Sequence, residues 1–182
     1  MIVKSKKQTE QGSTLMEWQL SGYTQPQQTA RGRVHTTKTG LASGTLILTA
    51  DGELPAEYLN PGDRIVSRNQ GMAVVKDVRS ALVKTRVAAI EPGALGHGSP
   101  GTSALLPVGQ TVLVRDDRAR PNGGQTASVV TISELIDGHS IRDLGRRVMI
   151  LISLDFEEPQ IIYADGIEVA IPHYRAEFRG AR

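Results

Sequence analysis

The chain alternates short apolar runs with turn segments that are rich in glycine, proline and aspartate. In the first half the runs are Thr45–Thr49, Arg64–Arg68 and Met72–Ile90, and all three contain β-branched residues. Such runs between turn residues are typical of strands. No segment keeps the period of about 3.6 residues that marks an amphipathic helix. The pattern therefore predicts an all-β fold.

Further strands are predicted in the second half of the chain. They cover Thr111–Arg115, Ala127–Ile132, Val148–Leu154, Ile161–Tyr163 and Ile167–Ile171. The run Met72–Ile90 is longer than the usual limit of about ten residues for a strand, so we expect one bent strand or two strands there.

Turn signals separate these strands. Asp51-Gly52 and Asp165-Gly166 each predict a tight hairpin turn, because both residue types tolerate positive φ. Residues 92–103 hold several glycines and prolines, which predicts a surface loop. Short helical turns are expected at Ala56–Leu59 and Ser133–Ile136.

The pattern also divides the chain into three parts. Residues 1–33 form a polar arm, residues 34–172 the predicted β domain, and residues 173–182 a basic tail. Trp18 is the only tryptophan of the chain and lies in the arm. We expect it to pack the arm against the body, with a partner-binding anchor as the alternative.

A weak internal repeat is present within the β domain. Each copy has an apolar strand, an acidic turn, a short helical turn and a glycine that precedes another strand. The segments are Thr45–Thr49, Ala56–Leu59 and Gly62–Ile65 in the first copy, and Thr111–Arg115, Ser133–Ile136 and Gly138–Ile141 in the second. The repeat predicts pseudo-two-fold symmetry.

Composition and charge limit the classes of molecule that the protein is expected to bind. The net charge is only +2 and aromatic residues make up 4% of the chain, so neither a nucleic-acid surface nor a base-stacking platform is expected. A protein partner is the expectation, and the oligomeric state stays open. The absence of cysteine excludes disulfides, thiolate metal sites and cysteine nucleophiles. No signal peptide, transmembrane segment or membrane insertion is expected, so the compartment is open between the cytoplasm and non-classical secretion.

Four stretches of the β domain carry a resemblance to a known family. They are Leu41–Ile47, Pro55–Val66, Glu91–Ser99 and Ala164–Glu168. Together they resemble the Hint domain, the hedgehog/intein fold, and in particular the bacterial group called Hint type 2. The resemblance covers about residues 38–172 and implies an all-β horseshoe with pseudo-two-fold symmetry.

The residues that the resemblance implies for catalysis are missing. Hint chemistry begins with an acyl shift onto a thiol or hydroxyl, which needs a base and oxyanion donors. Gly40 stands where the family has its nucleophilic cysteine, and Gln110 where it has a histidine. A second, later histidine is also absent, because Ser153–Pro159 contains none. These departures favour a degenerate site without autoprocessing activity.

Other chemistry is less well supported by the sequence. Ser43 and Thr45 are the candidate hydroxyl nucleophiles if the domain is active, but a strand-entry Ser43 bonded to backbone is the expectation. The four histidines have no metal-ligand spacing, so neither a metal nor a cofactor is expected.

The leading hypothesis is a non-catalytic Hint-like domain that serves as a structural or protein-interaction module. The alternatives are a self-processing domain with a nonstandard hydroxyl nucleophile and a phage or secretion accessory β protein.

Overall fold

A computed structural model describes residues 39–116 and 126–172. The described part confirms the all-β prediction. Its strands are β1 (Leu41–Ala42), β2 (Leu46–Thr49), β3 (Gly52–Pro55), β4 (Arg64–Ser67), β5 (Gly71–Val74), β6 (Asp77–Ile90), β7 (Ala104–Pro107), β8 (Thr111–Asp116), β9 (Thr126–Thr131), β10 (Ile141–Asp155), β11 (Gln160–Ala164) and β12 (Ile167–Ile171). A 3₁₀ turn, η1 (Ala56–Tyr58), and a short helix, α1 (Ile132–Leu135), complete the described elements.

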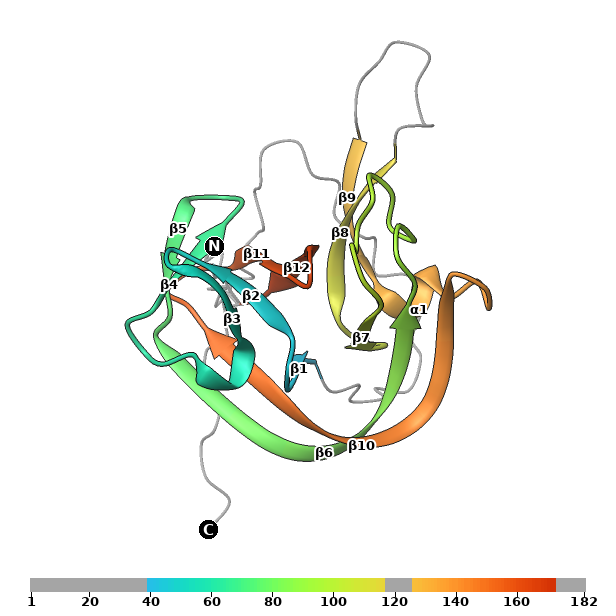
Figure 1. The fold of residues 1–182 in the computed structure, drawn as a ribbon, viewed down its shortest axis with the longest axis horizontal. Helices are drawn as coiled ribbons and strands as arrows, with labels where there is room; N and C mark the ends of the chain where they lie inside the picture. The colour runs from blue at the N-terminus through green and yellow to red at the C-terminus, as the bar shows by residue number, and fades with distance from the viewer. Residues whose placement is uncertain (1–38, 117–125, 173–182) are drawn as a thin grey trace, which may run out of the picture.

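The strands form two sheets. One has the order β1-β10-β6-β7, and the other has the order β3-β2-β4-β11-β12-β8-β9 with β5 paired to β4. The long strands β6 and β10 pair antiparallel from Asp77 opposite Asp155 to Ile90 opposite Ile141, with an irregularity between Asp143 and Arg146. They make a curved ribbon that joins the two halves of a horseshoe (Figure 1).

The predicted repeat has a physical basis in the structure. Hairpin β2–β3 leads into η1, and hairpin β8–β9 leads into α1. The first residue of each helical turn donates its backbone N–H to the carbonyl just before its hairpin. Ala56 bonds Thr45 at 2.8 Å, and Ile132 bonds Gln110 at 2.9 Å. Equivalent bonds in both halves support the pseudo-two-fold arrangement.

The hydrophobic core is common to both halves. Ile47 and Ile65 from the first half and Val112 and Ile132 from the second are fully buried in one apolar cluster. Burial of such a side chain contributes about 1.5–3 kcal/mol. The core therefore holds the two sheets together as one folded unit.

Met72–Ile90 holds two strands, which is one of the two expectations for this run, because Val75 still bonds Asp63 whereas the amide of Lys76 bonds Asp155 on the ribbon. Two other elements differ from the sequence-based expectations. Strand β7 was not predicted, and β10 begins at Ile141 rather than at Val148. The predictions for Trp18, the polar arm and the basic tail lie outside the described residues.

Candidate functional site

Gly40 and Gln110, the two positions that the family resemblance singles out, are in direct contact. Gly40 precedes β1 and Gln110 precedes β8. The backbone N–H of Gly40 donates a hydrogen bond to Oε1 of Gln110 at 2.9 Å. The amide of Gln110 therefore contacts the Thr39–Gly40 peptide bond, where the resemblance implies the acyl shift.

The backbone conformation at Gly40 favours glycine over residues with a side chain. Its φ is +139°, in a region that side-chain-bearing residues rarely adopt. A Cβ at this position would lie 3.1 Å from the carbonyl oxygen of Ile152 and 3.4 Å from Cβ of Leu151. A cysteine or serine here would thus be strained and crowded by β10.

Gln110 is a buried bridge between separate segments. Its side chain is almost fully buried, and its Nε2 donates to the carbonyl of Ala170 on β12 at 2.9 Å. One amide group therefore satisfies the Gly40 N–H and the Ala170 carbonyl together. A neutral amide can hold this geometry but cannot take up a proton, so Gln110 supplies no general base.

Ser43 lies at the surface, and the expectation for its hydroxyl was wrong. The hydroxyl donates to Oε1 of Glu57 at 3.0 Å rather than to backbone, while the Ser43 N–H donates to the carbonyl of Ile150. The same carboxylate accepts from the N–H of Gly44 at 2.7 Å. This backbone hydrogen bond is the main reason why the pKa of Glu57 lies below its usual value.

Thr45 is buried and held by the hairpin between β11 and β12. Its hydroxyl hydrogen-bonds the carboxyl of Asp165, which also accepts from the Leu46 N–H at 2.8 Å. Burial is the main cause that raises the pKa of Asp165. Thr45 and Ser43 therefore have different partners, and neither hydroxyl contacts Gln110.

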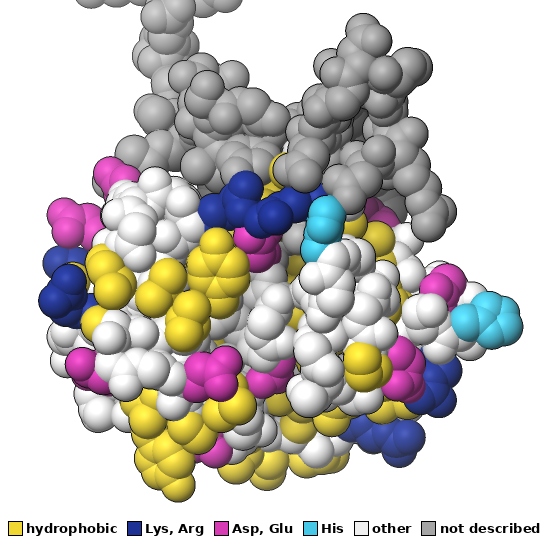
Figure 2. Space-filling model, turned by 45° about the horizontal axis from the view of Figure 1, so that its top comes forward, with side chains coloured by type: hydrophobic (Ala, Val, Ile, Leu, Met, Phe, Trp, Pro, Cys, Tyr) yellow, Lys and Arg dark blue, Asp and Glu magenta, His cyan; other side chains and the backbone are white. Residues whose placement is uncertain are grey.

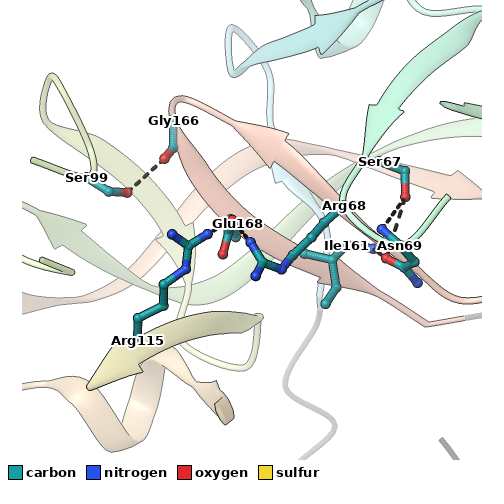
Figure 3. A network of polar contacts seen from close by, with 8 residues as sticks. All are labelled: Ser67, Arg68, Asn69, Ser99, Arg115, Ile161, Gly166 and Glu168. Atoms are coloured by element: carbon teal, nitrogen blue, oxygen red, sulfur yellow. Dashed lines mark hydrogen bonds and ion pairs between the residues drawn. The ribbon is translucent and has the colours of Figure 1, made fainter. Parts of the chain in front are cut away.

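A second polar cluster was not found from the sequence. Glu168 on β12 accepts from Arg68 at 2.7 Å and from Arg115 at 2.5 Å, both through Oε1 (Figure 3). The cluster borders a hollow of about 180 Å³ that His97 and Tyr163 also line. Figure 2 shows basic side chains next to a histidine, with an acidic side chain beside them, along this edge of the described part. The three charged residues are too far apart in sequence to form a motif.

The described residues form neither a metal-binding cluster nor a membrane-spanning helix. Across residues 39–116 and 126–172, no three histidine, aspartate or glutamate side chains gather as a metal site. In the same ranges no helix is long and apolar enough to cross a bilayer. The stretch that lacks the later histidine, Ser153–Pro159, includes the end of β10 and the buried Phe156.

Comparison with known families identifies the class of protein. The model of the Hint domain family matches residues 39–170. Because this match spans most of the chain, the protein belongs to the Hint domain family, and the predicted Hint-like fold is confirmed. No curated protein matches the chain.

Several solved inteins and intein-like domains are similar in structure. The gp41-1 intein is 14% identical, with 75% of this chain and 99% of that chain covered and a TM-score of 0.44. A bacterial intein-like domain from Clostridium thermocellum is 14% identical, with 75% of this chain and 99% of that chain covered and a TM-score of 0.48. A DnaB intein from Synechocystis sp. PCC 6803 is 14% identical, with 75% of this chain and 100% of that chain covered and a TM-score of 0.48.

Proposed function

We propose that this protein is a Hint domain without autoprocessing activity, which serves as a structural or protein-interaction module. The observation that carries the proposal is the conformation of Gly40. Its φ of +139° and its 3.1 Å approach to the Ile152 carbonyl leave no relaxed place for a nucleophilic side chain. Gln110 contributes a hydrogen bond to the same peptide but no proton transfer.

Intact-mass spectrometry tests the proposal. The purified protein should keep its full-length mass, with or without added thiol or hydroxylamine, because no acyl shift creates a bond that these nucleophiles cleave. A truncated species that starts near residue 40 would overturn the proposal.

A reconstructed site sharpens this test. The double variant Gly40→Cys/Gln110→His restores the side chains that the family resemblance implies. We expect it to stay intact and to be less stable than the parent protein, because Cβ would press against Ile152. Gly44→Cys is the matched control, since Gly44 also has positive φ but a Cβ there meets nothing within 4 Å. Cleavage of the double variant would contradict the backbone argument.

A second candidate function rests on Ser43. Its hydroxyl donates to a carboxylate, and the carbonyl of Ala42 accepts from the Thr45 N–H at 3.1 Å, so a hydroxyl, its carboxylate acceptor and an N–H donor to the neighbouring carbonyl lie together. The lowered pKa of Glu57 makes it a weak base, which is why this function ranks second. If Ser43 acts, any cleavage in the mass experiment stops in Ser43→Ala. Nothing in the geometry of the site favours the third hypothesis, a phage or secretion accessory protein.

A further inference from the structure

The outer side of the β6–β10 ribbon carries an apolar cluster at the surface. Leu82 is 72% exposed, Val148 65% and Ile150 46%. Leu82 lies directly opposite Ile150, and Val148 lies two residues from Ile150 on the same face. We call these three residues the ribbon patch. Large apolar side chains that gather at a surface are a mark of interaction sites.

The backbone beside the ribbon patch has an open edge. The carbonyl of Ile150 accepts from the Ser43 N–H, so the polar backbone groups of Ile150 point away from β6. Because this direction alternates along a strand, the N–H and C=O of Val148 and Arg146 point the same way. β1 pairs with β10 only at Leu151 and Ile152, and no described strand continues along this edge. Figure 1 shows the ribbon as the outer rim of the horseshoe.

The charges next to the ribbon patch are positive and unpaired. Lys84 lies opposite Val148, and Arg146 lies two residues before it, so both are on the face of the patch. Within residues 39–116 and 126–172, neither has an ion pair or a side-chain hydrogen bond. Arg86, by contrast, is paired with Asp143. The open edge is therefore flanked by two cations that lack a counter-charge.

We propose that the open edge of β10 binds an extended segment of a partner protein that carries both acidic and apolar residues on one face, at every second position. The segment would add as a strand beside Arg146–Ile150, with apolar side chains on the ribbon patch and carboxylates near Lys84 and Arg146. Main-chain hydrogen bonds give affinity in such strand addition, and alternate side chains give specificity. The proposal rests on the proposed function, because it names the interaction surface of the non-catalytic module.

A second copy of this chain fits the surface less well than an acidic partner. Two copies that paired through the same edge would bring Lys84 and Arg146 of one copy close to those of the other, and like charges at a contact oppose association. A dimer of the free protein that forms through this edge is therefore an outcome that would overturn the proposal.

The test uses the full chain and two synthetic probes. One is a capped nonapeptide whose odd positions, which would face the ribbon patch, alternate between glutamate and valine and whose even positions are threonine, and the other replaces each glutamate with lysine. Backbone amide shifts in nuclear magnetic resonance spectra report binding residue by residue. We expect the acidic peptide to shift Arg146, Val148 and Ile150, and the basic peptide to bind about tenfold more weakly or worse, since its ammonium groups would meet the like charges of Lys84 and Arg146.

Variants separate the parts of the proposal. Lys84→Glu/Arg146→Glu should reverse the preference between the two peptides, whereas Arg64→Glu, an exposed cation on β4, should leave it unchanged. Leu82→Thr should weaken binding of the acidic peptide. N-methylation of the patch-facing residues of the peptide should abolish binding, because it removes the donors that strand addition needs without changing the protein.

Three results would overturn the proposal: no shifts with either peptide, equal shifts with both, or shifts centred away from the β10 edge. The two proposals fail independently, because the intact-mass experiment reports cleavage near residue 40 whatever the peptides do. A full-length mass together with absent peptide binding would leave the non-catalytic module standing and remove this surface.

Discussion

Gln110 has a structural role that follows from its hydrogen bonds. The family resemblance implies a histidine at this position, and the amide that stands here hydrogen-bonds the backbone of two other segments. Buried amides of this kind contribute little net energy when paired, but their loss leaves buried backbone groups without partners. The strength of this bridge can therefore be measured by removing it.

Gln110→Ala should lower the free energy of unfolding by about 2–4 kcal/mol, because it leaves a cavity, removes the acceptor of the buried Gly40 N–H and leaves the Ala170 carbonyl with only the longer bond from the Thr111 hydroxyl. Urea denaturation followed by circular dichroism measures the change. Gln70→Ala is the matched control, since exposed Gln70 bonds only Glu158 and should change stability by less than about 0.5 kcal/mol. Equal effects of the two variants would contradict a bridging role.

The raised pKa of Asp165 should make the stability of the protein depend on pH. Burial raises its pKa above the ordinary 3.8, so the folded state holds the proton more tightly than the unfolded state does. Its stabilising contribution is complete below the unfolded pKa and is lost as pH rises through the folded pKa. Asp165→Asn cannot ionise, yet it keeps an acceptor for the Leu46 N–H and tolerates the φ of +50°.

Relative to the parent, Asp165→Asn should therefore gain stability as pH rises from about 3.8, and the gain should level off above the folded pKa. Urea denaturation of both proteins at a series of pH values from acid to neutral measures this difference. A difference that does not change with pH would mean that burial of the carboxyl has no energetic consequence.

At the scale of elements, Glu168 connects three strands. It lies on β12 and binds Arg68, which follows β4, and Arg115 on β8. The Glu168 side chain is 11% exposed, and the side chains of Arg68 and Arg115 are 28% and 31% exposed. The ion pairs are thus partly shielded from solvent and contribute more than exposed pairs do.

Glu168→Gln should destabilise the protein by about 1–2 kcal/mol, because two neighbouring arginines lose their shared counter-charge. The cost should shrink as sodium chloride is added, since salt screens both the lost attraction and the new repulsion. Urea denaturation at low and high salt measures it. Glu157→Gln, which breaks the exposed pair with Lys76, serves as the control and should have almost no effect.

The elements also show what the sequence can and cannot predict. Strands such as β2, β8 and β12 were found because β-branched runs end at recognisable turns. Strand β7, Ala104–Pro107, was missed since it contains no β-branched residue, and the first half of β10 since its charged residues hide the strand pattern.

Some residues of the candidate site could also be predicted from the sequence, and others could not. Gly40 and Gln110 could be found by position within a family pattern, and the structure brings them together. The partners Ala170 and Glu57 could not, because hydrogen bonds between distant segments leave no periodic signal in a sequence. This is also why Ser43 was wrongly expected to bond backbone.

At the scale of the whole molecule, the two halves do not have separate cores. Strands β11 and β12 come last in the described chain but lie between the first-half strands β2 and β4 and the second-half strand β8 in the larger sheet. Ile162 on β11 is fully buried in the cluster that contains Ile65 and Val112. The pseudo-symmetric halves should therefore fold and unfold together, although each has its own hairpin and helical turn.

Ile162→Ala tests this cooperativity. It should lower the free energy of unfolding by about 2–5 kcal/mol, the usual cost of a large-to-small change in a core. Urea should still produce one transition, and hydrogen exchange of the amides in β2 and β8 should accelerate by the same factor, because both strands lose their protection only when the shared core opens. Two separate transitions, or faster exchange in β2 alone, would show that the halves are independent folding units despite their common sheet. Ala81→Gly, at an exposed position of β6, gives the size of effect expected from a strand change outside the core, about 0.5–1 kcal/mol.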